Sequence, residues 1–280
     1  MPASKTPKVI TAAVIQMNSG DDKIKNLAAA ETLIHAAAAR GAKIAVLPEM
    51  FSWRGPRKDT HKFSELISGP TIARLSRVAA AANISVLAGS IAERSSHKTK
   101  VYNTSVLIGA DGRIRASYRK IHLFQFQLKN GTAIREDRIF LPGDRIACSR
   151  VSGCMFGFSI CYDLRFPGLY RALCARGCQA FFAPSAFTFE TGKLHWEVLL
   201  RARAIENQSY ILAPNQCGRN PQGFEDYGHS MIIGPLGEVL AAASQPEDIV
   251  IAELNLSHVS AVRKQLPLLK HIRNDAYRIK

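Results

Sequence analysis

The feature that most constrains the fold is an alternation of short apolar, β-branched runs with longer helical patterns along the whole sequence. Such runs predict strands, and apolar residues that recur every three to four positions predict amphipathic helices. The expected strands span residues 9–16, 44–47, 84–89, 101–108, 156–161, 180–183, 210–213, 231–233 and 249–254. The expected helices span residues 23–40, 71–82, 168–176, 194–207 and 259–265. Strands and helices that interleave throughout a chain predict a layered α/β fold.

The organisation of the chain favours one domain over residues 1–280. A length of 280 residues allows one or two domains, but no linker, low-complexity tract or tandem repeat divides the sequence. The runs 84–89 and 101–108 and the following turn Ala110-Asp111-Gly112 predict antiparallel hairpins. Because the two halves are loosely similar in element order, we expect two stacked sheets within one domain.

Charge and hydropathy narrow the possible functions. The net charge is +15, but basic residues are spread along the chain, with local enrichment only at 54–58 and 263–280. Neither segment has the interleaved aromatics of an RNA-binding surface, so we expect a basic solvated surface or attraction of anionic substrates instead of nucleic-acid binding.

No uncharged apolar run reaches the roughly 18 residues of a membrane span. The polar start of the sequence has no signal-peptide pattern, so a cytoplasmic location is expected.

The cysteines do not form a metal-binding pattern. The chain has six: Cys148, Cys154, Cys161, Cys174, Cys178 and Cys217. Their spacings contain no paired C-x2-C knuckle, and a chain of this length with no secretory signal does not predict a disulfide framework. We therefore expect neither a metal ion nor an organic cofactor, and five of the cysteines are interpreted as ordinary thiols.

The segment that ends at Cys161 is the most informative in the chain. An apolar strand is expected to end at this residue, and a polar turn and a helix follow it. A side chain at such a strand end projects beyond the sheet edge, where ligand sites of α/β folds lie. A cysteine whose pKa is lowered by a nearby cation is a strong nucleophile, and backbone amides after the turn can face an oxyanion. The alternative is a buried structural cysteine.

Two further polar residues follow expected strands. Glu49 comes directly after Pro48, which cannot continue a central strand, and Lys120 closes the segment that begins near Arg113. A carboxylate at a strand end can accept a thiol proton and later protonate an amine. An ammonium can stabilise a thiolate and an oxyanion. Each residue can also be an ordinary solvated side chain, and nearby His122 is interpreted as a hydrogen-bonded core histidine instead of a base.

Together, and in this order, the three segments resemble the nitrilase superfamily of carbon–nitrogen hydrolases, which has a Glu–Lys–Cys set at these motifs. The similarity extends through residues 181–187, 195–207, 216–219 and 227–230, and runs from about residue 9 to residue 277. The run Cys-Tyr-Asp-Leu-Arg-Phe-Pro at 161–167 resembles the Nit-type amidase branch. True nitrilases instead have Trp-Glu-Asn after the cysteine.

The resemblance implies a four-layer αββα sandwich of two mixed β-sheets flanked by helices. It also implies pairing through helices into a homodimer or a higher homo-oligomer, with a C-terminal tail from about 262 to 280 that packs across the partner. The family has a second glutamate between the lysine and cysteine motifs, and Glu136 fits that position, with Asp137 as the nearby alternative. Its implied role is to orient Lys120 or the substrate amide.

The activity implied by the resemblance is hydrolysis of the terminal amide of a small carboxylate-bearing amide, through a cysteine thioester and with release of ammonia. Omega-amidases and deaminated-glutathione amidases act in this way, and residues 216–219 look more like the latter. The alternatives are acyl transfer from the thioester to an amine, N-carbamoyl hydrolysis, and a non-catalytic basic interaction protein.

Four residues near the nucleophile are expected to contact the substrate: Tyr162, Arg165, Phe187 and Thr191. Arg165 can pair with a substrate carboxylate, or with Asp163 as a structural ion pair. The chain departs from the family pattern at Gln125, which replaces the usual acid, and the loop from 125 to 138 is unusually basic.

Overall fold

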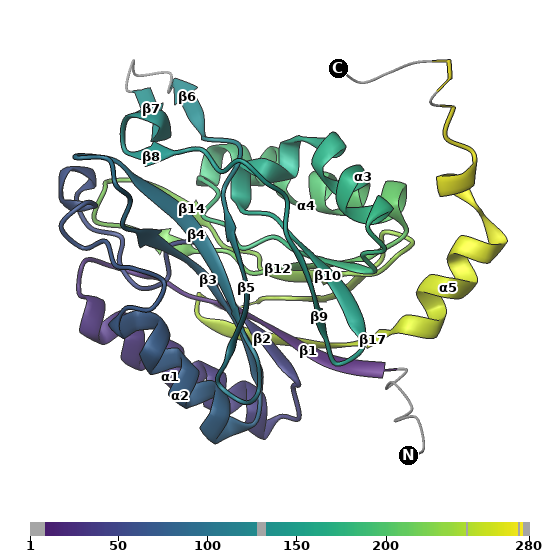
Figure 1. Ribbon diagram of the computed structural model, residues 1–280, viewed down its shortest axis with the longest axis horizontal. Coiled ribbons are helices and arrows are strands. Elements are labelled where there is room, and N and C mark those ends of the chain that lie inside the picture. Colours follow the sequence, from purple (N-terminus) through teal and green to yellow (C-terminus); the bar gives the residue numbers. More distant parts are fainter. Residues whose placement is uncertain (1–8, 128–132, 245, 274, 277–280) are drawn as a thin grey trace.

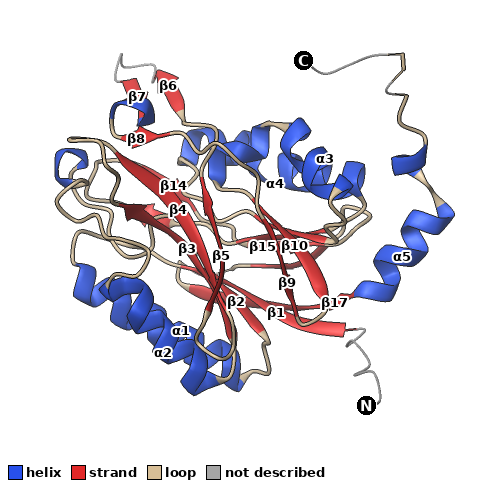
Figure 2. Cartoon of the chain, in the orientation of Figure 1, coloured by secondary structure: helices blue, strands red, loops and turns tan. Residues whose placement is uncertain are grey.

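The computed structural model describes residues 9–127, 133–244, 246–273 and 275–276. The chain forms an αββα sandwich, in which two mixed sheets face each other and helices cover their outer faces (Figures 1 and 2). The fold expected from the resemblance is thereby confirmed.

The first sheet has the strand order β17-β1-β2-β3-β4-β5, with β8 beside β4. These strands are β1 (Val9–Gln16), β2 (Ile44–Val46), β3 (Ser85–Glu93), β4 (Val101–Ile108), β5 (Ile114–Arg119), β8 (Phe140–Leu141) and β17 (Asp248–Asn255). The strands β1, β2 and β3 are parallel. The pairs β17–β1, β3–β4 and β4–β5 are antiparallel, and β8 runs parallel to β4. The carboxyl ends of β1 to β3 therefore lie at one edge of the sheet.

The second sheet repeats this plan with the order β16-β15-β12-β11-β10-β9. Its strands are β9 (Cys148–Val151), β10 (Cys154–Phe158), β11 (Ala180–Phe182), β12 (Tyr210–Ala213), β15 (Met231–Ile233) and β16 (Val239–Ala242). Three central strands are again parallel, with Phe156 opposite Ala180 and Ala180 opposite Tyr210. The loose similarity of the two halves thus reflects two sheets of similar construction.

Helices and small hairpins complete the chain. The helices are α1 (Lys23–Ala39), α2 (Pro70–Ala82), α3 (Pro167–Ala175), α4 (Phe189–Asn207) and α5 (Leu256–Gln265), and short 3-10 turns are η1 (Arg57–Asp59), η2 (Glu136–Arg138), η3 (Cys161–Arg165) and η4 (Leu268–Lys270). One hairpin joins β6 (Gln125–Gln127) to β7 (Ala133–Arg135), and the other joins β13 (Cys217–Arg219) to β14 (Glu225–Tyr227). Part of the basic loop noted in the sequence, residues 128–132, lies outside the described residues.

The alternation of side chains along β1 explains the layers. Ile10 and Val14 face the core between the two sheets, whereas Ala13 and Ile15 face the core under α1 and α2. A strand that is apolar at most positions is typically buried on both faces, as β1 is from Ala12 to Gln16. The core between the sheets is continuous with apolar residues of α3, α4 and α5 in one cluster, which supports our proposal that the chain is one domain. Among the described residues, no helix combines the length and the apolar character needed to cross a bilayer.

Two predicted boundaries were wrong in ways that matter for the site. The strand expected to end at Cys161 ends at Phe158, because Cys161 leaves the ladder and begins η3. Helix α4 begins at Phe189, five residues before the predicted start at Leu194. Its first turn includes Gly192, a poor helix former, but a side chain there would overlap Tyr227, so close packing explains this glycine. The segment 189–191, expected as a loop, is therefore helical.

Candidate active site

Glu49 follows β2 and lies at the edge of the first sheet. The backbone N–H of Leu47 still donates to Leu87, and Pro48 then ends the pairing. Gly89 of β3 allows the Pro48 backbone to approach β3 closely, because a Cβ at position 89 would lie 1.9 Å from the Pro48 carbonyl oxygen. The buried Gln216 side chain donates to the Glu49 carbonyl at 2.9 Å and to Ser19 Oγ at 3.0 Å, which holds the Glu49 backbone in place.

Cys161 sits on the second sheet's side of the same cleft in a strained conformation. Its φ is +49°, in the left-handed region that residues with a Cβ seldom adopt. Its N–H donates to the Pro184 carbonyl at 3.0 Å, and the preceding Ile160 N–H donates to Asp163 Oδ2 at 2.9 Å. These bonds stabilise a turn that directs the thiol out of the sheet ladder and into the pocket that Glu49 also lines.

Lys120 is fully buried and joins two carboxylates. Its Nζ donates to Glu49 Oε1 at 2.8 Å and to Glu136 Oε1 at 3.0 Å. Asn103 Nδ2 also donates to Glu49 Oε1 at 2.8 Å, and the Phe124 N–H donates to Glu136 Oε2 at 2.7 Å. The ammonium and both carboxylates are therefore paired, as burial of charge requires.

The electrostatics favour a thiol beside an ionised carboxylate. Burial raises the pKa of Cys161 well above its usual value, and the Glu49 charge adds to this, although Lys120 and the Ala186 N–H act in the opposite direction. Burial also tends to raise the pKa of Glu49, but the Lys120 charge and hydrogen bonds from Lys120, Cys161 and Asn103 lower it overall. Burial and the neighbouring carboxylate thus outweigh the effect of the lysine on the thiol pKa. Glu49 is thus suited to accept the thiol proton.

The pKa values of Lys120 and Glu136 are both raised, for different reasons. Burial favours neutral Lys120, but the Glu136 and Glu49 charges raise its pKa well above the usual value. Burial raises the pKa of Glu136, Lys120 lowers it, and repulsion from Glu49 leaves it raised overall. The alternative acid Asp137 instead pairs with Arg135 at 2.7 Å.

Asp163 connects the lysine segment to the cysteine turn. It accepts hydrogen bonds from Tyr118 Oη at 2.7 Å and from the His122 N–H at 3.0 Å, and its Oδ1 lies 2.7 Å from His122 Nδ1. Because Tyr118 and His122 lie on either side of Lys120, one carboxylate positions both segments. The interpretation of His122 as a hydrogen-bonded histidine agrees with this contact and with its stacking on Phe166.

A pocket with two lobes opens onto Cys161. The larger lobe encloses about 770 Å³ of empty space including its mouth, and Glu49, Glu136 and Cys161 line it. The smaller lobe, of about 220 Å³, shares Phe124, Cys161, Ala186 and Thr188 with the larger one. The four expected substrate contacts, Tyr162, Arg165, Phe187 and Thr191, all line the smaller lobe.

Arg165 does not form the structural ion pair with Asp163 that was considered as an alternative. Among the described residues, its guanidinium contacts His195 Nδ1 at 3.3 Å and lies over the rings of Tyr162 and Phe187. Asp163 is instead occupied by Tyr118 and His122.

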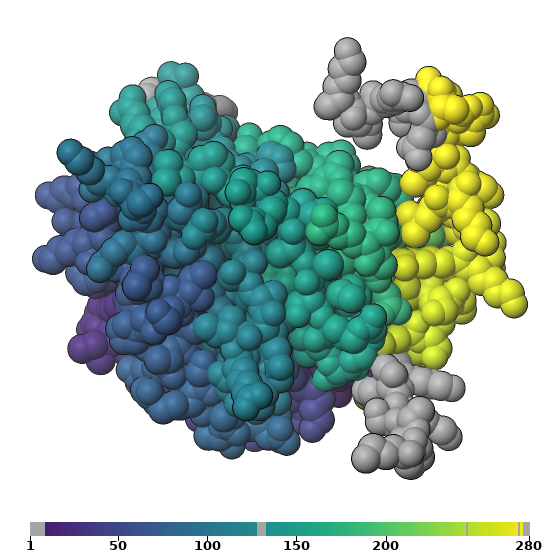
Figure 3. Space-filling model, in the orientation of Figure 1, coloured from purple at the N-terminus to yellow at the C-terminus, as the bar shows by residue number. Residues whose placement is uncertain are grey.

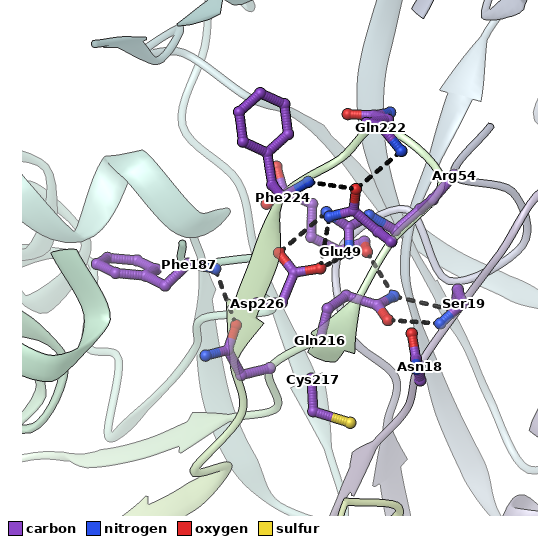
Figure 4. Close-up of polar contacts among 12 residues, drawn as sticks. Asn18, Ser19, Glu49, Arg54, Phe187, Gln216, Cys217, Gln222, Phe224 and Asp226 are labelled. Carbon is purple, nitrogen blue, oxygen red and sulfur yellow. Dashed lines mark hydrogen bonds and ion pairs between the residues drawn. The ribbon is translucent and has the colours of Figure 1, made fainter. Parts of the chain in front are cut away.

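The sequence analysis missed a polar wall of the larger lobe. Arg54 and Asp226 form a buried ion pair, with Arg54 Nη2 at 3.1 Å from Asp226 Oδ1, and Asn220 Nδ2 donates to Asp226 Oδ2 at 2.9 Å. Figure 4 shows this pair beside Glu49, with Gln222 and Phe224 next to it. The only sequence signal was the basic run 54–58, which does not reveal a partner 172 positions away.

No group of three or more His, Cys, Asp or Glu side chains in the described parts of the chain is arranged to hold a metal ion. The site brings together a thiol, a carboxylate and a buried ammonium at the edge of an αββα sandwich. This arrangement is typical of hydrolases that use a cysteine nucleophile.

The comparisons identify the family. Residues 11–264 match the carbon-nitrogen hydrolase family. The chain is 36% identical to omega-amidase NIT2 of Homo sapiens, over 95% of this chain and 96% of that protein. It is 38% identical to the deaminated glutathione amidase of Synechocystis, over 94% and 98% of the two chains. The crystal structure of Saccharomyces cerevisiae Nit3, a member of the nitrilase superfamily, superposes with a TM-score of 0.86 at 31% identity, over 98% and 100% of the two chains. The chain belongs to the carbon-nitrogen hydrolase family and is an amidase.

Proposed function

We propose that this enzyme hydrolyses the terminal amide of a small carboxylate-bearing amide, of the kind that omega-amidases and deaminated glutathione amidases use. The observation that carries the proposal is the buried contact of Lys120 with Glu49 and Glu136 beside the Cys161 thiol. The similarity to omega-amidase NIT2 and deaminated glutathione amidase supports the choice of substrate class.

In the proposed reaction, Glu49 accepts the Cys161 proton while the sulfur attacks the amide carbonyl carbon. The carbonyl electron pair moves to the oxygen, which Lys120 and a backbone N–H after Cys161 stabilise. The carbon–nitrogen bond then breaks, Glu49 protonates the leaving nitrogen, and ammonia departs from a thioester. Water attacks the thioester carbon while Glu49 takes a proton from it. The carbon–sulfur bond then breaks, the carboxylic acid product leaves, and Glu49 returns the proton to the Cys161 sulfur. Glu136 orients Lys120, and the residues of the smaller lobe contact the substrate.

A panel of amides tests this proposal. We expect ammonia release from monoamides of dicarboxylic acids, such as succinamate and 2-oxoglutaramate, and release of the amine-bearing dipeptide from deaminated glutathione. Because a charge-assisted hydrogen bond contributes about 1.5–3 kcal/mol, kcat/KM for these substrates should exceed that for uncharged amides of equal length by about tenfold or more. Absence of ammonia release from every carboxylate-bearing amide would contradict the proposal.

The helix α4 supports a proposal of a homodimer. Leu194 and Val198, each 67% exposed, and the exposed Ile205 lie along one side of α4, and the exposed Leu236 lies in the turn that contacts Ile205. Helical positions four and seven residues apart share a face. Such an exposed apolar surface marks an interaction site, and a twofold dimer apposes one such patch with its copy. In Figure 3, α5 and the described residues after it (yellow) stand at one edge of the body, where the implied tail contact with a partner would form.

We expect Val198→Glu to convert the dimer to monomers, because it would place two like charges in an apolar interface. Light scattering after size-exclusion chromatography measures the change. Ile24→Glu is the matched control, since Ile24 is 77% exposed on α1, outside the patch. A variant of Val198 that keeps the mass of the wild-type assembly would contradict this interface.

We further propose a reducing, cytoplasmic location. All six cysteines are free, including Cys174 in α3 and Cys178 just after this helix. Free thiols in this number are typical of reducing compartments.

A further inference from the structure

Among the described residues that line the larger lobe, Arg57 is a cation without a carboxylate in ion-pair contact. Lys120 faces two carboxylates, and Arg54 is paired with Asp226. Arg57 also lines the lobe, yet among the described residues no carboxylate lies within ion-pair distance of its guanidinium.

The surroundings of Arg57 hold it in a defined pose. Its Nε donates to Gln222 Oε1 at 3.3 Å, and Gln222 Nε2 is anchored on the Gly55 carbonyl at 3.0 Å. The guanidinium carbon lies 5.2 Å from the centroid of the Phe224 ring. With Nε engaged and one face against an aromatic ring, the terminal N–H groups are left for a ligand. The Phe224 N–H donates to Asn220 Oδ1 at 3.3 Å, and Asn220 in turn donates to Asp226. The ring that packs on Arg57 is therefore fixed by the same hydrogen bonds as Asp226, and Figure 4 shows Phe224 and Asp226 on this side of the pocket.

We infer that Arg57 binds the carboxylate of the substrate in the larger lobe, while the amide carbonyl lies at Cys161. This inference rests on the proposed function and assigns its charged specificity contact to Arg57 instead of Arg165. A guanidinium matches the planar geometry of a carboxylate with two parallel hydrogen bonds. Trp53, Phe124 and Phe140 line the same lobe, so its apolar surface suits the methylene chain between the two ends of a dicarboxylic acid monoamide.

Electrostatics support this assignment. Burial and repulsion from Arg54 lower the pKa of Arg57, and the Glu136 charge offsets only part of this. A cation that is desolvated beside a second cation is stabilised by an incoming anion. Arg165, by contrast, lines the lobe of about 220 Å³ and contacts His195 and two rings.

The test compares substrates that differ only in charge. For each enzyme, kcat/KM is measured for glutaramate and for the uncharged diamide glutaramide, and the ratio of the two values gives the selectivity for the carboxylate. Arg57→Gln should lower this ratio by about 10- to 100-fold, because it removes a charge-assisted hydrogen bond. Lys58→Gln is the matched control: Lys58 is exposed beside Arg57 and does not line the pocket, so the ratio should stay within about threefold of wild type. Arg165→Gln should change both values alike.

The outcomes separate the two proposals. The assignment of Arg57 is overturned if the glutaramate-to-glutaramide ratio of kcat/KM is unchanged in Arg57→Gln, or if it falls only in Arg165→Gln. If the wild-type enzyme hydrolyses neither amide, the proposed function fails, and calorimetric binding of glutarate to Cys161→Ala still decides the role of Arg57. Addition of Arg57→Gln should then weaken glutarate binding about tenfold or more. Equal affinity, or no binding to Cys161→Ala, overturns the assignment. Thermal unfolding of each variant establishes that it is folded.

Discussion

Replacement of Cys161 by serine is expected to abolish amide hydrolysis while the protein stays folded. The serine hydroxyl is a far weaker nucleophile than a sulfur whose proton is transferred to Glu49, so kcat/KM should fall by roughly 10⁴-fold or more. The hydroxyl can keep the hydrogen bond to Glu49, so the free energy of unfolding should change by about 1 kcal/mol or less. Ammonia release and urea unfolding measure the two quantities.

Cys148→Ser is the control for this prediction. Cys148 is a half-buried thiol on β9 that does not line either lobe of the pocket. The control should keep wild-type turnover. Mass spectrometry after exposure to an amide substrate should detect an acyl group on Cys161 and none on Cys148. Full turnover by Cys161→Ser would rule out the thioester mechanism.

Replacement of Lys120 by methionine is expected to have the largest combined effect on activity and stability. Methionine fills a similar volume but leaves Glu49 and Glu136 buried with no cation between them. Removal of one partner from a buried charge network typically costs about 3–5 kcal/mol. Loss of the oxyanion contact should also lower kcat by about 10²- to 10³-fold.

The pH dependence of this variant gives a sharper measurement than its stability at one pH. In the wild type, the pKa of Glu49 is lowered, so its contribution to stability is present above the unfolded pKa of about 4.3 and is lost as the pH falls through the folded value. Without Lys120, burial raises the pKa of both carboxylates, and the resulting penalty grows as the pH rises. The difference in unfolding free energy between wild type and Lys120→Met should therefore be largest near about pH 8 and smaller near about pH 5.

Lys23→Met is the matched control, because Lys23 forms a partly exposed ion pair with Glu65 away from the pocket. Such pairs contribute about 1 kcal/mol or less, so this variant should remain stable and active. A difference for Lys120→Met that does not vary with pH would show that Glu49 and Glu136 do not depend on Lys120 for their charge.

The layered fold was accessible from the sequence because hydrophobic periodicity is a local property. The run 9–16 has the apolar pattern of a strand buried on both faces, and β1 spans those residues. The predicted element boundaries were wrong where long-range contacts override the local preference of the sequence. Cys161 leaves its strand because Pro184 and Asp163 capture the neighbouring backbone groups. Helix α4 extends to Phe189 across the glycine that packs on Tyr227.

Some residues of the site were likewise predictable from the sequence, and others were not. Glu49, Lys120 and Cys161 were singled out because each was expected to close a strand, and family resemblance added Glu136. The ion pair of Arg54 with Asp226 was not predicted, because neither residue shows in its own segment that the other lies beside it. The raised pKa of Cys161 was also missed, since it depends on burial that the local sequence does not reveal.

By itself, the sequence determined the central strands and the helices between them, the family and the chemical identity of the reactive side chains, because these depend on local pattern and on motifs. It did not show the short strands β6 to β9, β13, β14 and β16. Only the tertiary structure decided that Lys120 lies between two carboxylates, that burial and Glu49 raise the pKa of Cys161, and that Arg57 has no anionic partner among the described residues. The physical reason is that pairing and desolvation depend on the register of distant strands, and a charge takes its chemical role from the groups packed against it.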